Sequence, residues 1–230
     1  MKLSNPFKKL NKFEWGLYIT SLTVSVISFI VSGMQDYLTF VSSITGVTAL
    51  IFVSKGMVIG QVLTMVFSLL YGVVSIYFKY YGEVITYLCM SMPMALVSVV
   101  SWIKHPYKDS HEVEVSKLTV KKLVVLSCFA IVVTVAFYYI LEALGTTNVL
   151  VSTISVTTSF FAASLTFLRS PYYAIGYSAN DIVLIVLWVL ASIEQISYLP
   201  MVFCFVMFLA NDLYGFYYWK EMQKRQKDGL

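Results

Sequence analysis

Residues 178–188 read "SANDIVLIVLW" and decide the fold class, because a single charged side chain, Asp181, precedes seven consecutive apolar residues. Residues 209–219, "LANDLYGFYYW", place a second Asn-Asp pair in another apolar run. Long apolar runs separated by short polar breaks are typical of helices that cross a membrane. The two pairs raise the question of why such segments keep an amide beside a carboxyl group.

The composition of the whole chain agrees with a membrane protein. Of its 230 residues, 59% are hydrophobic and 12% are charged, and the mean hydropathy is +0.79. A soluble domain has about 25% charged residues. A transmembrane β-barrel would alternate polar and apolar residues, and these runs do not alternate. The three cysteines, Cys89, Cys128 and Cys204, lie in apolar runs and indicate no disulfide framework. We therefore predict an all-α polytopic membrane protein.

Breaks in hydropathy predict eight transmembrane helices, each near the roughly 20 residues that a bilayer core requires. The first apolar run follows basic residues, as in a signal peptide, but it is long enough to span and no small-residue cleavage site follows it. We interpret it as a retained helix. The predicted spans are 14–32, 37–54, 57–79, 83–103, 120–141, 149–168, 172–191 and 195–219.

The distribution of basic residues predicts the orientation. With both termini in the cytoplasm, the inner side carries every Lys and Arg except Lys79. The four outer turns then carry one acid each, namely Asp36, Glu83, Glu142 and Glu194. An excess of Lys and Arg marks the cytoplasmic side of membrane proteins. A seven-span arrangement would place one basic terminus outside, so the charges favour eight spans.

An internal repeat is visible at a nearly constant offset. "VSSIT" at 41–45 matches "VSTIS" at 151–155, and "EVITYL" at 83–88 matches "EQISYL" at 194–199. The copies are four spans apart and so share one orientation, which predicts a 3+1+3 parallel repeat preceded by one extra helix. Parallel repeats are a known transporter design with a substrate site near the midplane. The predicted parts of the single transmembrane domain 1–230 are the N-terminal helix 1–36, repeat one 37–103, a cytoplasmic loop and linker helix 104–148, repeat two 149–219, and a cytoplasmic tail 220–230.

Polar residues inside the spans are the candidate substrate-binding groups. An Asp at the centre of a membrane helix costs about 2.5–3.5 kcal/mol, and such residues usually face the bundle interior or a water-filled cavity. The candidates are Asn180, Asp181, Gln61 and Asn211, and Asp212 lies nearer the cytoplasmic edge. The structural alternative is that these side chains only link helices, at about 0.6 kcal/mol per contact.

Aromatic residues accompany the polar candidates. Tyr177 lies four residues before Asp181 and shares its helix face, while Trp188 and Tyr214 follow the two pairs. A ring beside a carboxylate suits a flat, cationic ligand. Membrane packing and anchoring at the interface are the alternative explanation for these rings.

The sequence lacks the motifs of several kinds of enzyme. There is no P-loop and no G-x-S-x-G motif. The histidines, His105 and His111, lie in a polar loop where solvation explains them, and no Cys or His cluster has metal-ligand spacing. We therefore expect no catalytic residues, no metal, no cofactor and no nucleic-acid partner, and we predict that the protein is not an enzyme.

The chain resembles the Pnu family of vitamin and nucleoside transporters. The residues that carry this resemblance are "YYGEVITYLCMSMPMALVSVVSWIKHP" at 80–106, "FLRSPYYAIGYSANDIVLIVLWVL" at 167–190 and "ANDLYGFYYWKEMQK" at 210–224. The resemblance implies a core similar to sugar transporters of the SWEET type, a homotrimer in the bacterial inner membrane, and facilitated diffusion of nicotinamide riboside. It also implies a cytosolic kinase that phosphorylates the vitamin and so traps it.

One family motif is missing. Carriers of nicotinamide riboside show W-x-x-W in the span that begins here at Tyr172, where the counterparts are Ala174 and Tyr177 or Tyr173 and Gly176. A deoxynucleoside, thiamine or riboflavin therefore remains an alternative substrate. Proton-coupled symport through Asp181 is a second alternative, and an enzyme acting on lipid head groups, a sensor and an assembly partner are others.

Overall fold

The computed structural model describes residues 5–31, 33–34, 37–77, 80–108, 110–146, 148–194 and 196–229, which leaves Asp36 and Lys79 outside the described residues. Within these ranges the chain is helical, with two isolated β-bridges and no strand. Its helices are η1 (Pro6–Lys9), α1 (Lys12–Val31), α2 (Tyr37–Ser54), α3 (Val58–Tyr77), α4 (Tyr81–Ile85), the π-helix η2 (Thr86–Ser91), α5 (Met92–Lys104), α6 (Val120–Ala143), α7 (Val149–Phe167), α8 (Tyr173–Glu194), η3 (Ile196–Tyr198) and α9 (Leu199–Lys227).

Eight helices of the described chain are long and apolar enough to cross a membrane, which confirms the predicted spans. The segments α4, η2 and α5 together form the fourth of them. The last one is longer than predicted, because α9 continues from Leu199 to Lys227 instead of ending at residue 219. Its polar end consists of Glu, Gln, Lys, Arg and Met, which are all good helix formers.

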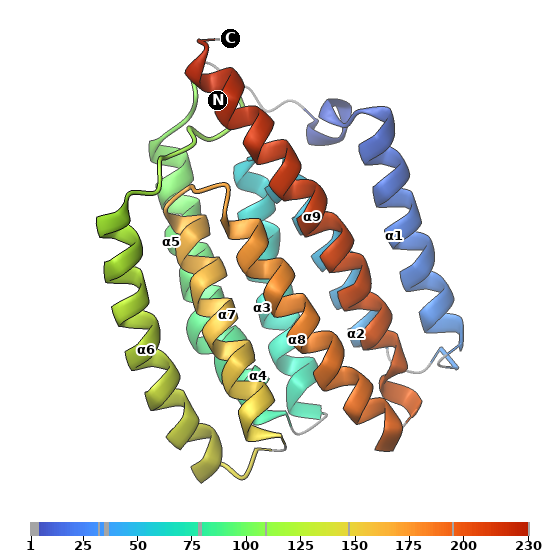
Figure 1. The fold of residues 1–230 in the computed structure, drawn as a ribbon. Helices are drawn as coiled ribbons and strands as arrows, with labels where there is room; N and C mark the ends of the chain where they lie inside the picture. The colour runs from blue at the N-terminus through green and yellow to red at the C-terminus, as the bar shows by residue number, and fades with distance from the viewer. Residues whose placement is uncertain are drawn as a thin grey trace.

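The helices form two packed groups with one outlying helix at each side (Figure 1). In the first group α2 packs on α3 and α3 on α5, and in the second α7 packs on α8 and α8 on α9. The groups meet where α2 contacts α9 and where α5 contacts α7. Helix α1 lies against α2 and α9, and α6 lies against α7. Each group thus touches the other through its first and its last helix, and the core of the bundle lies between them.

The fourth span is not a uniform α-helix. Pro93 has no N–H, and its ring excludes the carbonyl group of Cys89 from the usual α-helical position. The chain accommodates this with the π-helical turn Thr86–Ser91 directly before α5. The extra residue in that turn changes which side chains of the span face the core.

Glu83 lies elsewhere than the sequence analysis expected. We predicted it in an outer turn, but the structure places it inside α4 with 1% of its surface exposed. Glu142 and Glu194, two other acids assigned to outer turns, are exposed. Neither carboxyl oxygen of Glu83 has a hydrogen-bond partner among the described residues.

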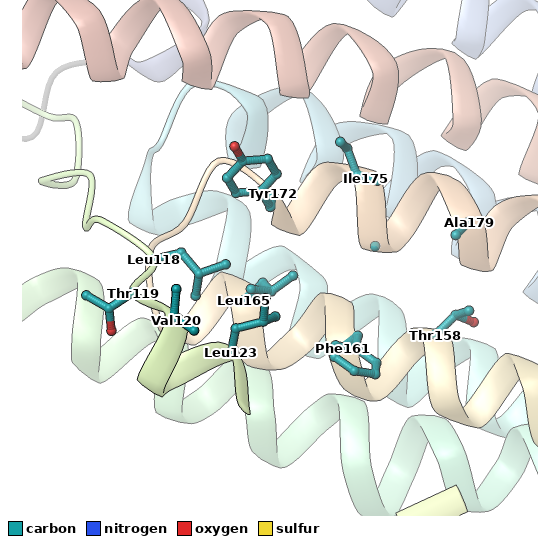
Figure 2. A pocket seen from close by; sticks show the side chains of 11 residues that line it. Leu118, Thr119, Val120, Leu123, Thr158, Phe161, Leu165, Tyr172, Ile175 and Ala179 are labelled. Carbon is teal, nitrogen blue, oxygen red and sulfur yellow. The ribbon is translucent and has the colours of Figure 1, made fainter. Parts of the chain in front are cut away.

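A second hollow lies on the outside of the second group. An apolar groove runs between the start of α6 and α8, with α7 as its floor (Figure 2). It forms because α6 packs on α7, whereas α8 approaches α7 closely at Gly176. A Cβ atom on Gly176 would lie 2.9 Å from the Cα atom of Ala162.

Replacing Gly176 by Val should therefore force α8 away from α7. Overpacking of this kind costs about 1–3 kcal/mol, so we expect a lower melting temperature for the purified variant in detergent. Gly16→Val is the matched control, because a Cβ atom at Gly16 meets nothing within 4 Å. Equal melting temperatures for the two variants would contradict the close packing of α7 and α8.

Candidate functional site

A central cavity lies between the two groups of helices and is the candidate substrate site. Its volume is about 50 Å³. Polar side chains and rings line it together, from α2, α3, η2, α7, α8 and α9. The lining residues are Gly46, Ala49, Leu50, Val53, Gln61, Thr64, Phe67, Ser68, Tyr87, Ser91, Ser159, Tyr177, Asn180, Asp181, Phe208 and Asp212.

Asn180 is held in one orientation by α7. Its side-chain oxygen accepts hydrogen bonds from Ser159 Oγ at 2.9 Å, from Thr158 Oγ1 at 2.9 Å and from Ser155 Oγ at 3.3 Å. An amide oxygen has two lone pairs, so these hydroxyl groups occupy it fully. A ligand in the cavity would therefore meet the NH₂ group of Asn180, which acts as a donor.

Asp181 and Asp212 form a carboxyl pair at the contact between α8 and α9. Both are 3% exposed, and both line the cavity. Two carboxylates that line one small buried cavity repel each other, and a proton on one of them or a cation between them would relieve this repulsion. No Lys or Arg of the described residues lines the cavity. A buried carboxyl pair without a basic neighbour favours a proton or a cationic ligand as its partner.

The structure brings together four of the seven predicted site residues, Gln61, Tyr177, Asn180 and Asp181. Tyr177 and Asp181 line the cavity from one helix face, as their spacing predicted. Gln61 reaches the cavity from the first turn of α3 and is 3% exposed.

The other three predicted residues lie away from the cavity. Trp188 lies two turns beyond Asp181 and donates Nε1–H to the hydroxyl of Tyr71 at 2.9 Å. Asn211 donates from Nδ2 to Ser21 Oγ of α1 at 3.1 Å, and Tyr214 donates its hydroxyl to Glu14 Oε1 of α1 at 2.6 Å. Consecutive helical residues point about 100° apart, so Asp212 turns towards α8 while Asn211 turns towards α1.

Several lining residues escaped the sequence analysis. Tyr87 and Ser91 come from the π-helical turn, and Phe67 and Phe208 add two more rings. Tyr87 belongs to the repeated stretch "EVITYL", and that repeat was the signal that could have singled it out. Ser159 carries no such signal, because Ser and Thr are frequent throughout α7.

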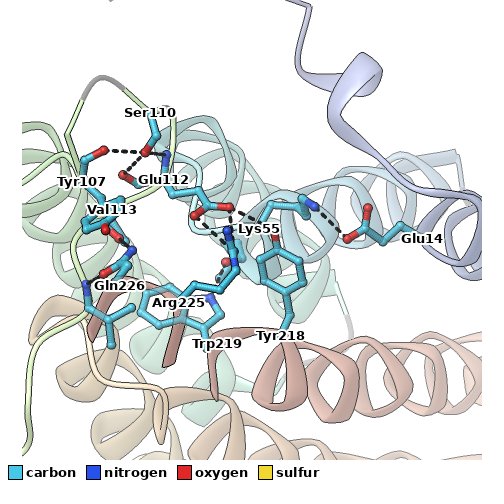
Figure 3. A network of polar contacts seen from close by, with 12 residues as sticks. Glu14, Lys55, Tyr107, Ser110, Glu112, Val113, Tyr218, Trp219, Arg225 and Gln226 are labelled. Atoms are coloured by element: carbon cyan, nitrogen blue, oxygen red, sulfur yellow. Dashed lines mark hydrogen bonds and ion pairs between the residues drawn. The ribbon is translucent and has the colours of Figure 1, made fainter. Parts of the chain in front are cut away.

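A network of polar contacts closes the end of the bundle where the described chain begins and ends (Figure 3). Glu14 of α1 is completely buried, and its Oε1 lies 2.9 Å from Lys55 Nζ in the turn between α2 and α3. Lys55 Nζ also lies 4.2 Å from the ring centroid of Tyr218. The Tyr218 hydroxyl donates to Glu112 Oε1 at 2.9 Å, and Arg225 pairs with the same oxygen at 3.2 Å. The network thus joins α1, two connecting segments and α9.

The local sequence explains why Glu14 is available for this role. Glu14 N–H donates to Asn11 Oδ1 at 2.9 Å and Asn11 N–H donates to Glu14 Oε2 at 2.6 Å, which is the reciprocal capping arrangement of a helix start. Burial alone would lower the pKa of Lys55, but hydrogen bonds to Tyr218 and Glu14 outweigh it and raise the pKa. Lys55 therefore stays charged, and the pair is a buried ion pair.

Replacing Lys55 by Met should destabilise the protein, because it leaves the Glu14 carboxylate buried without a cation. Breaking a buried pair from one side costs about 3–5 kcal/mol, whereas replacing both partners is often neutral. We expect a clear drop in melting temperature for Lys55→Met and a partial recovery in the double variant Lys55→Met/Glu14→Gln. Additive losses in the double variant would show that the two side chains do not depend on each other.

These features define a class of protein: a polytopic helical membrane protein with a polar cavity between two groups of helices. The model of the family described as "Nicotinamide mononucleotide transporter" matches residues 36–221. The chain therefore belongs to this transporter family and is a multi-pass membrane protein, as the resemblance to the Pnu family indicated.

The chain is also similar to individual transporters and to a solved structure. It is 28% identical over 196 residues to the nicotinamide riboside transporter PnuC of Neisseria mucosa, which covers 83% of this chain and 74% of the relative. It is 25% identical over 193 residues to PnuC of Haemophilus influenzae, with 83% and 82% covered. A crystal structure described as the vitamin B3 transporter PnuC superimposes with a TM-score of 0.83 at 26% identity, covering 94% of each chain.

Proposed function

We propose that this protein carries nicotinamide riboside across the bacterial cell membrane by facilitated diffusion. The observation that carries the proposal is the pair Asp181 and Asp212 in a cavity that no described Lys or Arg lines. Nicotinamide riboside contains a flat, positively charged pyridinium ring, which a carboxylate stabilises by charge and an aromatic ring by stacking. The names of the relatives support the same substrate.

The lining residues suggest a role for each part of this ligand. Asp181 and Asp212 would neutralise the pyridinium charge, and Tyr177 and Tyr87 would offer ring faces. The NH₂ group of Asn180 and the amide of Gln61 would bind ribose hydroxyl groups. Each of these side chains lines the cavity, and no catalytic step is needed for the transport that we propose.

Transport requires the two groups of helices to move apart. A cavity of about 50 Å³ is far below the roughly 300–1,000 Å³ of small-molecule sites. We infer that α2 moves against α9 and α5 against α7, the two places where the groups meet. Rocking of one repeat against the other about a midplane site is the general mechanism of such transporters. The Glu14–Lys55 network would then hold one side closed.

The same proposal includes the repeat organisation of the chain and its orientation in the membrane. We propose that residues 37–103 and 149–219 are the two parallel repeats, and that residues 104–148 link them. Both termini would be cytoplasmic, because the basic residues gather at that side. We further propose a homotrimer in the inner membrane and a cytosolic kinase that phosphorylates the imported vitamin.

Replacing Asp181 by Asn should weaken the binding of nicotinamide riboside by about tenfold or more, because the pyridinium ring loses an opposite charge whose attraction at close range is worth about a few kcal/mol. Calorimetry on the purified protein measures the affinity for nicotinamide riboside. Thiamine, riboflavin and a deoxynucleoside are tested as the other ligands. Asp228→Asn is the matched control, because Asp228 is exposed at the end of α9. Tight binding of one of the other ligands instead of nicotinamide riboside would contradict the proposed substrate. Unchanged affinity in Asp181→Asn would contradict the proposed role of Asp181.

The buried carboxyl groups of Asp181 and Asp212, which a proton could neutralise, favour one second candidate, proton-coupled symport. Facilitated diffusion predicts that nicotinamide riboside enters proteoliposomes without any change of internal pH. A pH-sensitive dye inside the vesicles, read with and without an uncoupler, distinguishes the two mechanisms. Acidification of the interior together with substrate entry would establish symport, and its loss in Asp181→Asn would identify the carrier.

A further inference from the structure

The groove between α6 and α8 is a second site, separate from the central cavity. It encloses about 550 Å³ and shares no lining residue with the cavity. Apolar side chains of three helices form its walls and floor, among them Leu123 of α6, Phe161 and Leu165 of α7, and Ile175 and Ala179 of α8 (Figure 2). Ile175 is 47% exposed and Leu123 is 43% exposed.

The position of the groove decides which molecules can reach it. It runs along the first turns of α6 and α8, both of which are membrane-spanning helices. Within the bilayer, an apolar groove on the outer surface of a bundle is in contact with lipid tails. Walls made by membrane-spanning helices are open to a hydrocarbon chain rather than to a soluble partner.

The mouth of the groove is polar and basic. Thr119 and Tyr172 are two of the residues that line this end of the groove, and Lys220 Nζ lies 3.1 Å from the Tyr172 hydroxyl and 4.2 Å from the centroid of its ring. Lys122, one turn after Thr119 in the chain, is exposed and lies 3.5 Å from Ser116 Oγ. Its neighbour Lys121 is exposed too.

A further cationic residue, Arg169, lies beside the segment that leads into α6. Ser116 N–H donates to the carbonyl oxygen of Arg169 at 3.0 Å, which places Arg169 beside the segment leading into α6. Burial lowers the pKa of Arg169, and the nearby Glu114 opposes this effect. Nε and Nη1 of Arg169 are buried without a hydrogen-bond partner among the described residues. No acidic residue lines the groove itself.

We propose that this groove binds one acyl chain of an anionic phospholipid, with the phosphate between Lys122, Lys220 and the hydroxyl groups of Thr119 and Tyr172. Charge complementarity supports this occupant, because basic side chains at a membrane surface attract anionic lipids. The apolar walls accept the chain, and the basic mouth selects the head group. The lipid would stabilise the contact of α6 with α7 and α8 and is independent of the transported substrate.

Lipid retention tests the acyl-chain part of the proposal. Mass spectrometry of protein purified in mild detergent should find bound phosphatidylglycerol or another anionic phospholipid. Ala179→Phe fills the groove and should reduce the retained lipid by about tenfold. Ala136→Phe, an equally large change at an exposed position of α6, should leave it unchanged. Equal retention in both variants would overturn the proposal.

The head-group part has its own test. In nanodiscs with equal amounts of phosphatidylglycerol and phosphatidylcholine, the protein should retain mainly phosphatidylglycerol. Lys122→Gln/Lys220→Gln should abolish this preference, while Lys8→Gln/Lys9→Gln at the exposed N-terminal segment should preserve it. An unchanged preference in the first double variant would refute phosphate binding there. If Ala179→Phe instead dissociates an oligomer, another copy of the chain occupies the groove and the proposal is wrong.

Discussion

A buried polar group in a membrane protein is costly unless it finds a partner within the protein, because the bilayer core offers no water. This constraint organises the second group of helices. The oxygen of Asn180 accepts hydrogen bonds from the hydroxyl groups of Ser155, Thr158 and Ser159, and so fixes α8 on α7. Thr134 and Thr157 share a hydrogen bond of 2.7 Å and so connect α6 to α7. The frequent Ser and Thr residues of α7 thus orient a donor group at the cavity.

The same constraint separates what the sequence can and cannot predict. The spans follow from composition alone, because a long apolar run has no other stable environment. Composition does not predict which face of each helix points to the cavity, since helical periodicity gives only the angle between two residues of one helix. The sequence therefore identifies both Asn-Asp pairs but cannot tell that Asp212, and not Asn211, reaches the cavity. For Trp188 and Tyr214 the deciding partners, Tyr71 and Glu14, lie on helices distant in sequence.

The repeated stretches "EVITYL" and "EQISYL" show a second limit. Glu83 of the first copy is buried, while Glu194 of the second is exposed. Similar sequences thus have unlike environments, because the fourth span contains a π-helical turn before Pro93, whereas α9 begins after a short 3₁₀ turn at Ile196–Tyr198. Only the first copy contributes its tyrosine, Tyr87, to the cavity. A sequence repeat therefore predicts a shared chain topology, but it does not predict that matching residues have the same surroundings or role.

The Glu14 contacts also have a consequence for how the chain is made. Glu14 and Lys55 are 41 residues apart in the chain, and Glu14 and Tyr214 are 200 residues apart. The ribosome therefore releases α1 long before α9 exists, and the Glu14 carboxylate acquires its tyrosine partner only when α9 has been synthesised. Helix α1 therefore completes its contacts only after α9 has been synthesised, although Lys55 is available to Glu14 much earlier.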